Sequence, residues 1–198
     1  MSEITTTMQG KAGAIGPGRL VLVVGPSGAG KDTLLRLAQA ACADDSDVVF
    51  PRRVVTRASS ADEDNIAMSA EDFARARGRG DFAVHWDAHG HSYALPLQIN
   101  EHIRAGRVVV VNVSRTVIAA LRQAYANVIV VAITAPPEVL AQRLAARSRN
   151  SDGNIADRLA RSVDDTSANA DVTILNAGSA EYHSRQLVRA IRNEGWLE

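Results

Sequence analysis

Residues 25–33 read GPSGAGKDT, and their types and spacing are suited to binding phosphate. The glycines of this stretch can take positive φ, so its backbone can wrap an anion and point N–H groups at it. The apolar run at 19–25 predicts a buried strand before the loop, and a helix is expected after it, whose N-terminus also favours negative charge. Lys31 would reach the outer phosphates. The residues expected to bind a nucleoside triphosphate are Gly25, Pro26, Ser27, Gly28, Ala29, Gly30, Lys31, Asp32 and Thr33.

Asp32 stands where this loop pattern usually has Ser or Thr to hold magnesium. A carboxylate there could bind Mg²⁺ directly or through water, and Thr33 offers a second oxygen ligand. The strand expected at 107–114 carries no carboxylate, although a second acidic ligand ordinarily ends it, and this favours a metal role for Asp32. Asp32 could instead cap its helix, where negative charge is favoured. The sequence leaves both interpretations open.

A group of arginines lies in segment 143–161, around the turn sequence NSDG. Fixed cations suit phosphoryl transfer because they neutralise the charge that develops on the transferring group. We therefore predict an arginine-rich lid with NSDG as its hinge, and an ordinary charged helix face is the alternative. The arginines are Arg143, Arg147, Arg149, Arg158 and Arg161.

The stretch 50–99 differs in character from the rest and is predicted to bind the second substrate, with a mere cap over the sheet as the alternative. Its expected order is strand, turn, short helix and strand, ending with FAVHWDAHGHSYALP. The histidines at 85, 89 and 91 lack a fourth ligand and a nearby cysteine, which argues against zinc. Trp86 is interpreted as core beneath the acceptor site rather than as a stacking platform.

The rest of the chain predicts a doubly wound α/β fold of the P-loop type, with a parallel sheet. Buried strands are expected at 19–25, 107–114, 128–134 and 171–177, and helices at 32–43, 115–126, within 135–149 and at 179–193. Residues 1–18 are expected to form a flexible leader and 19–198 a single domain.

Composition limits the partners. The 198 residues carry 22 basic and 22 acidic side chains, so there is no electrostatic reason to expect nucleic acid or a membrane surface as partner. No apolar run approaches the roughly 20 residues of a membrane span. Cys42 is the only cysteine, which favours a reducing cytoplasm. A small molecule is the expected partner, and a homodimer stays open.

Four segments resemble the guanylate kinase-like P-loop kinases, and most closely the ribose 1,5-bisphosphate phosphokinase family, over about 19–190. They read GPSGAGK, VVTR, FAVHWDAHGHSYALP and RLAARSRNSDGNIADRL. The resemblance implies that ATP and Mg²⁺ are used to convert a sugar phosphate, ribose 1,5-bisphosphate, to 5-phosphoribosyl 1-diphosphate in phosphonate breakdown. That family's loop commonly reads GKD followed by Ser or Thr, so the resemblance makes Asp32 a family trait.

Individual residues carry this resemblance in part. Arg57 and Tyr93 match residues with which guanylate kinases grip the acceptor's phosphate, and Arg147 and Arg158 match the two arginines of the lid. The carboxylate that reads guanine in the FLE segment is absent, because this chain has VHW there. The resemblance therefore argues against GMP as acceptor. Glu63 and Asp64 are candidates for the ribose hydroxyls or a metal, with an exposed turn as the alternative, and His89 is a candidate for the sugar phosphate.

Three functional hypotheses follow. A sugar-phosphate kinase making 5-phosphoribosyl 1-diphosphate ranks first, and a nucleoside monophosphate kinase of the guanylate kinase type is the alternative. A non-enzymatic binding module is disfavoured, because Lys31 and the lid arginines are suited to phosphoryl transfer.

Overall fold

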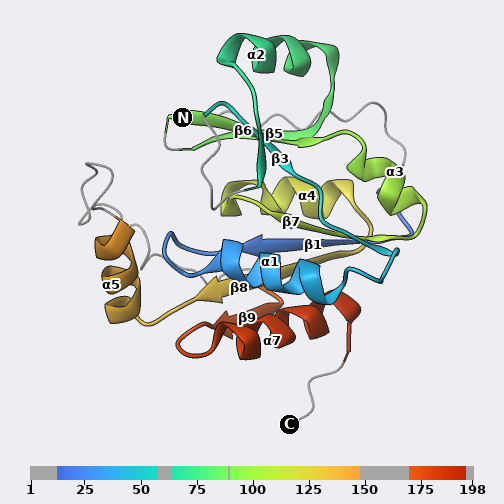
Figure 1. Cartoon of the computed structure of the whole chain (residues 1–198). Helices are drawn as coiled ribbons and strands as arrows, with labels where there is room; N and C mark the ends of the chain where they lie inside the picture. Colours follow the sequence, from blue (N-terminus) through green and yellow to red (C-terminus); the bar gives the residue numbers. More distant parts are fainter. Residues whose placement is uncertain (1–12, 58–63, 89, 148–169, 195–198) are drawn as a thin grey trace. The chain divides into compact units, whose positions relative to one another are not determined.

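The computed structural model describes residues 13–57, 64–88, 90–147 and 170–194 (Figure 1). The chain divides into two compact units. Within the described ranges, unit 1 comprises residues 13–22 and 45–128, and unit 2 comprises residues 23–44 and those from 129 onward.

A five-stranded sheet has the strand order β2-β7-β1-β8-β9. β2 pairs in parallel with β7, and β8 pairs in parallel with β9. Most side chains in the middle strands are buried, as expected for strands covered on both faces. The predicted α/β class with a parallel sheet is confirmed. The strands are β1 (Arg19–Val24), β2 (Val48–Val49), β7 (Val108–Asn112), β8 (Val128–Thr134) and β9 (Val172–Leu175).

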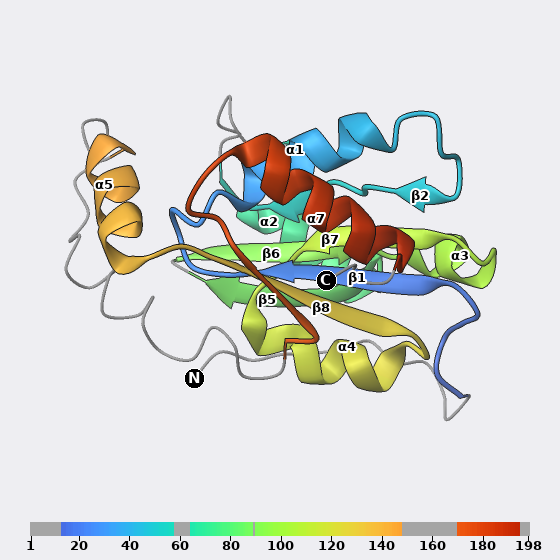
Figure 2. The ribbon, with the colours of Figure 1, turned by 90° about the horizontal axis from the view of Figure 1, so that it is seen from below.

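Unit 2 contains three described helices: α1 (Lys31–Ala41), α5 (Pro137–Arg147) and α7 (Ala180–Arg192). α1 and α7 lie side by side in both views of the ribbon (Figures 1 and 2). α7 starts at Ser179, whose side chain accepts a hydrogen bond from the Tyr182 N–H, as an N-cap residue does. Both helices agree with the predicted ranges to within two residues, which is the usual uncertainty of a helix end.

Unit 1 contains α2 (Ala70–Arg79), α3 (Ile99–Arg104) and α4 (Ile118–Ala124), the last preceded by a 3₁₀ turn, η1 (Arg115–Val117). The apolar pattern does not predict α3, and it predicts η1 and α4 as one helix. In the parts of the chain that the structure describes, no helix is both long and apolar enough to cross a membrane.

A second, four-stranded sheet lies in unit 1 in the order β4-β3-β6-β5. β3 pairs in parallel with β4, while β6 runs antiparallel to both β3 and β5. The strands are β3 (Arg53–Val55), β4 (Asn65–Ala67), β5 (Phe82–Ala88) and β6 (His91–Pro96).

The predicted order of the stretch 50–99 is wrong in two respects. β4 follows β3 before the helix, and the segment predicted as one strand is the hairpin of β5 and β6. Gly90 has φ 76°, a value at which an L side chain is strained, and it lies in the turn between these strands. β5 and β6 therefore form a hairpin, which a search for apolar runs did not separate into two strands.

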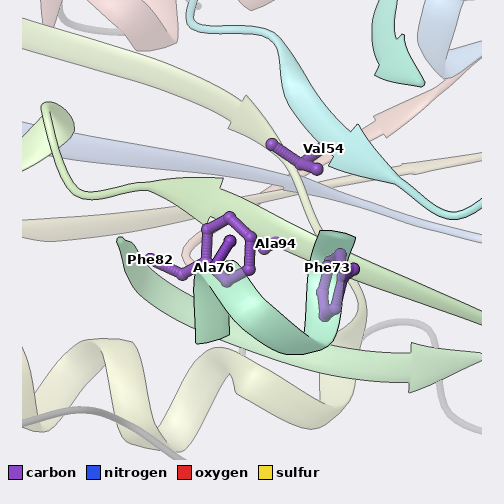
Figure 3. Close-up of a cluster of buried hydrophobic side chains, with 5 residues drawn as sticks. All are labelled: Val54, Phe73, Ala76, Phe82 and Ala94. Carbon is purple, nitrogen blue, oxygen red and sulfur yellow. The ribbon is translucent and has the colours of Figure 1, made fainter. Parts of the chain in front are cut away.

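α2 packs against the four-stranded sheet through an apolar cluster (Figure 3). Phe73 and Ala76 lie three positions apart, on one face of α2. They pack against side chains of β5, β6 and β3, namely Phe82, Ala94 and Val54. The rings of Phe73 and Phe82 have centroids 4.8 Å apart. Burial of these side chains holds the helix on the sheet that carries the candidate acceptor residues.

The last residues of the expected leader are attached to unit 1. The Ile15 N–H donates to the Ala124 carbonyl at 2.8 Å, and the Ile15 carbonyl accepts from the Ala126 N–H at 2.9 Å. The Gly18 N–H donates to the Ile103 carbonyl at 2.9 Å. These backbone bonds tie the chain down before β1 begins, whereas residues 1–12 of the expected leader lie outside the described ranges.

Candidate active site

The loop between β1 and α1 has the strand, loop and helix order predicted for it. Gly25, Gly28 and Gly30 have φ of 146°, 85° and 86°. Gly30 is the N-cap of α1, and the Leu34 N–H donates to its carbonyl at 3.0 Å. The N–H groups at the start of a helix have no acceptor within the helix, so together with the helix dipole they are suited to an anion. The geometry is therefore that of a phosphate-binding loop.

The ammonium group of Lys31 lies against this loop. Its Nζ donates to the Gly25 carbonyl and to the Pro26 carbonyl, each at 2.9 Å, and the residue is half-buried. A lysine side chain is otherwise flexible, and two such bonds fix it in one place. The structure thus places the predicted catalytic cation beside the backbone that would bind phosphate.

Asp32 and Thr33 lie in the first turn of α1, where Asp32 is half-buried and Thr33 exposed. Gly30 is the N-cap of α1, so the hypothesis that Asp32 caps this helix is wrong. Apart from a metal role, Asp32 can still stabilise the helix through the interaction of its negative charge with the helix dipole. The described residues contain no group of three or more His, Cys, Asp or Glu that could hold a metal by itself. Carboxylate and hydroxyl oxygens beside a phosphate loop nevertheless fit Mg²⁺, which such sites bind together with substrate phosphates.

The role of Asp32 can be measured through magnesium. If its carboxylate helps to hold the ion, Asp32→Ala should raise the magnesium concentration for half-maximal rate, because one negatively charged ligand is lost. The free energy of unfolding should change by no more than about 1 kcal/mol, the usual scale of an end-of-helix effect. The measurement is a magnesium titration of the rate beside thermal unfolding, with Asp44→Ala, exposed and beyond the other end of α1, as the control. If the magnesium titration were unchanged and only the stability of Asp32→Ala were lower, Asp32 would have no role in metal binding and would act only on the helix dipole.

Arg143 and Asn176 contact the carbonyl side of the loop. Arg143 Nη1 donates to the Gly28 carbonyl at 3.3 Å and the Ala29 carbonyl at 3.5 Å, and its Nη2 donates to the Asn176 carbonyl at 3.2 Å. Asn176 Nδ2 donates to the Ala29 carbonyl at 2.8 Å. The sequence pattern predicts Arg143 only as part of the lid segment, and Asn176 only as part of the strand at 171–177. The one available signal was a polar residue at the carboxyl end of a predicted strand, where α/β folds place functional residues.

Several predicted residues lie beyond what the structure describes. Arg147 is the last residue of α5, and its side chain is not described. Arg158 of the lid and the acceptor candidates Glu63 and His89 lie outside the described ranges, so their roles stay predictions.

Unit 1 brings Arg57 and Tyr93 to neighbouring strands. Arg57 follows β3 and is half-buried, and Tyr93 lies on β6 opposite Val55 of β3. The Thr56 N–H donates to the Ser92 carbonyl at 3.0 Å, and the Ser92 N–H donates to Thr56 Oγ1 at 2.8 Å. These bonds continue the pairing to the residue before Arg57. The two candidates for the acceptor's phosphate therefore lie at one end of the same strand pair.

Tyr93 is held in place by two side chains that lie near its ring. The Trp86 ring stacks on it with centroids 5.6 Å apart and an interplanar angle of 10°. The Arg53 guanidinium lies 5.7 Å from the Tyr93 centroid, within the range of a cation–π contact. Arg53 also donates to Asn65 Oδ1 and to the Asn112 carbonyl, each at 3.3 Å. Trp86 is 3% exposed, so its assignment to the core is confirmed, and Arg53 is a residue that sequence analysis missed.

His85 lies next to Trp86 on β5 and is buried. Burial lowers the pKa of His85 below its ordinary value, and the nearby positive charge of Arg77 lowers this pKa further. The lowered pKa favours the neutral form of the imidazole. The permanent cation on the described acceptor strands is Arg53 of β3.

Comparisons with known proteins agree with this geometry. The family model described as an AAA domain matches residues 20–173. The ribose 1,5-bisphosphate phosphokinase PhnN of Bradyrhizobium diazoefficiens is 83% identical over 198 residues, which cover all of both chains. The protein of the same name from Rhodopseudomonas palustris is 61% identical over 179 residues, which cover 90% of this chain and 91% of the relative.

Among solved structures, the guanylate kinase from Anaplasma phagocytophilum matches with a TM-score of 0.66 and 19% identity, covering 91% of this chain and 87% of that one. This likeness shows a shared P-loop kinase fold alone. The identities to the two bacterial relatives extend over nearly the whole length of each protein. The chain therefore belongs to the ribose 1,5-bisphosphate phosphokinase family of phosphotransferases.

Proposed function

We propose that this chain transfers the γ-phosphoryl group of ATP to the 1-phosphate of ribose 1,5-bisphosphate, which yields 5-phosphoribosyl 1-diphosphate and ADP. The observation that carries the proposal is the 83% identity over the full length to a protein named for this activity. The intact loop with Lys31 supports it, because the chain keeps the ammonium that phosphoryl transfer needs.

The donor side of the reaction depends on unit 2. When bound, ATP supplies the phosphoryl group, and magnesium offsets the charge of its outer phosphates. The loop N–H groups and the N-terminus of α1 bind phosphate oxygens, and Asp32 with Thr33 offers oxygen ligands for the metal. Lys31 Nζ, which lies 2.9 Å from two loop carbonyls, is placed to follow the transferring group. Arg147 and Arg158 of the segment 143–161 add positive charge as a lid.

The acceptor side depends on the region 50–99. An acceptor phosphate oxygen is already anionic, so the reaction needs no general base, and catalysis reduces to alignment and charge neutralisation. Arg57 and Tyr93 hold one phosphate, while Glu63 and His89 contact the sugar and its phosphate. Trp86 and Arg53 restrict the Tyr93 ring to one position, which keeps its hydroxyl at a fixed place in the strand pair.

The sequence and the family membership support a proposed setting for the reaction. The substrate is a small sugar phosphate, and neither nucleic acid nor a membrane is needed as a partner. The single cysteine, Cys42, is buried and fits a reducing cytoplasm. Phosphonate breakdown is the pathway that the family membership implies, and a homodimer stays open.

The acceptor assay tests this function directly. With ATP and Mg²⁺, ribose 1,5-bisphosphate should be converted at least about 100-fold more efficiently, by kcat/KM, than GMP or AMP is phosphorylated. The physical reason is that a site without groups for a base leaves the donors and acceptors of that base unpaired. Phosphorus NMR should show a new diphosphate on the sugar. GMP as the better acceptor would overturn the assignment in favour of a guanylate kinase.

A further inference from the structure

Two side chains from distant parts of unit 2 meet at the same loop carbonyl. The Ala29 carbonyl accepts from Asn176 Nδ2 at 2.8 Å and from Arg143 Nη1 at 3.5 Å. Arg143 also bonds to the Gly28 carbonyl at 3.3 Å and, through Nη2, to the Asn176 carbonyl at 3.2 Å. The guanidinium therefore links the loop to the chain just after β9, and the amide of Asn176 makes a second link to the same place.

These bonds fix the direction of a peptide plane. In a trans peptide the carbonyl and the following N–H point in opposite directions, so the Ala29 carbonyl and the Gly30 N–H belong to one rigid unit. The bonds from Arg143 and Asn176 hold the Ala29 carbonyl toward these two residues. The Gly30 N–H is therefore directed the opposite way in the peptide plane, away from them. The Gly28 carbonyl fixes the preceding peptide in the same way, and there the Ala29 N–H closes a turn onto the Pro26 carbonyl at 3.3 Å.

The packing around Asn176 leaves little freedom. Asn176 is 3% exposed, and its own N–H donates to the Thr134 carbonyl at 2.7 Å. A Cβ on Gly30 would lie 2.4 Å from Asn176 Nδ2, so the amide packs directly on the loop backbone. Asn176 Oδ1 is buried and has no hydrogen-bond partner in the described part of the chain. Since an unpaired buried acceptor costs free energy, the amide contributes here through its Nδ2 donor.

We propose that Arg143 and Asn176 are positioning residues that act as one brace on the loop. The brace holds the peptide between Ala29 and Gly30 so that the Gly30 N–H faces the phosphates of ATP, keeps the preceding peptide in its turn onto Pro26, and so sets the affinity for the nucleotide. The brace acts through hydrogen bonds to the loop carbonyls. A positive charge at position 143 without the planar guanidinium donors therefore does not maintain the brace. The inference rests on the proposed use of ATP but not on the identity of the acceptor.

Three single variants and one double variant test the brace in the full-length protein. Arg143→Met removes the charge and the donors, Arg143→Lys keeps the charge but lacks the planar fork, and Asn176→Leu keeps the size but removes the donor. The dissociation constant of ATP, measured by titration calorimetry without acceptor, should rise about 10-fold in each, the scale of a lost charge-assisted or buried hydrogen bond. The KM for ribose 1,5-bisphosphate should stay within about 2-fold, because only the loop is altered.

The double variant Arg143→Met with Asn176→Leu separates one brace from two independent contacts. Because both residues act through the Ala29 carbonyl, the dissociation constant should be within about 3-fold of the weaker-binding single variant, whereas independent effects would multiply to about 100-fold. Gln142→Ala and Arg185→Ala, both exposed on unit 2 helices, serve as matched controls and should bind ATP like the wild type.

Several results would overturn the brace. The first is an unchanged dissociation constant of ATP in the single variants, or in Arg143→Lys alone. The second is a double variant whose dissociation constant rises by the product of the two single effects. The third is a rise in the KM for ribose 1,5-bisphosphate as large as the rise in the dissociation constant of ATP. If Asn176→Leu does not fold, Asn176→Ser is measured in its place, because its hydroxyl is too short to reach Ala29. Failure of the acceptor assay with these ATP results intact would overturn only the proposed acceptor, so the two failures are distinguishable.

Discussion

Replacing Lys31 with alanine is expected to lower turnover by about 100- to 1,000-fold, the scale on which enzymes lose rate when a preorganised charge contact is removed. The ammonium lies against the loop through bonds of 2.9 Å to the Gly25 and Pro26 carbonyls. The ammonium is therefore already in place when negative charge develops on the oxygens of the transferring group. In Lys31→Ala, water would fill its site and would have to reorient during the reaction, which raises the barrier. Single-turnover kinetics with saturating ATP would measure the loss on the chemical step.

Two further variants sharpen this expectation. Lys31→Arg should recover little of the rate, because a planar guanidinium does not fit the position of a compact ammonium held between two carbonyls. Arg36→Ala, on the exposed side of the same helix, should leave turnover unchanged. Near-wild-type turnover in Lys31→Ala would remove this residue from the mechanism.

Replacing Gly25 with alanine is expected to lower the free energy of unfolding by at least about 3 kcal/mol. A Cβ at this position would lie 2.0 Å from the Ile133 carbonyl oxygen, a backbone atom of a buried strand. The φ of 146° adds strain that an L side chain does not tolerate. Because β8 cannot move aside without losing its pairing with β9, the loop has to shift, and phosphate binding should weaken as well. Chemical denaturation and ATP titration measure the two effects.

Gly78→Ala is the matched control for this prediction. Gly78 lies within α2, and a Cβ there would meet nothing within 4 Å. Alanine in a helix interior is favoured over glycine by about 0.5 to 1 kcal/mol, so this variant should be slightly more stable than the wild type. If Gly25→Ala were as stable as Gly78→Ala, the close approach of the loop to Ile133 would be refuted.

The sequence by itself determined the features that depend on local pattern. The run at 128–134 predicts β8 residue for residue, because a continuous apolar segment of that length, followed after one residue by Pro136 and Pro137, has few alternatives to a buried strand. The glycines and Lys31 likewise predict the loop and its helix, since few other residue types allow that backbone. The stretch 50–99 was predicted less well, because its hairpin and short strands are defined by pairing partners rather than by long apolar runs.

Only the tertiary structure decided which distant residues serve the loop. Asn176 donates to Ala29 across 147 positions of sequence, and Arg143 reaches Gly28 across 115. Neither pairing follows from the types of these residues, because asparagine and arginine occur on many surfaces and their partner here is a backbone carbonyl that every residue has. The tertiary structure brings the end of β9 and the middle of α5 to the loop, and this arrangement is set by packing over the whole unit. Local pattern therefore specified the groups that would face phosphate, and long-range packing specified the groups that hold them in place.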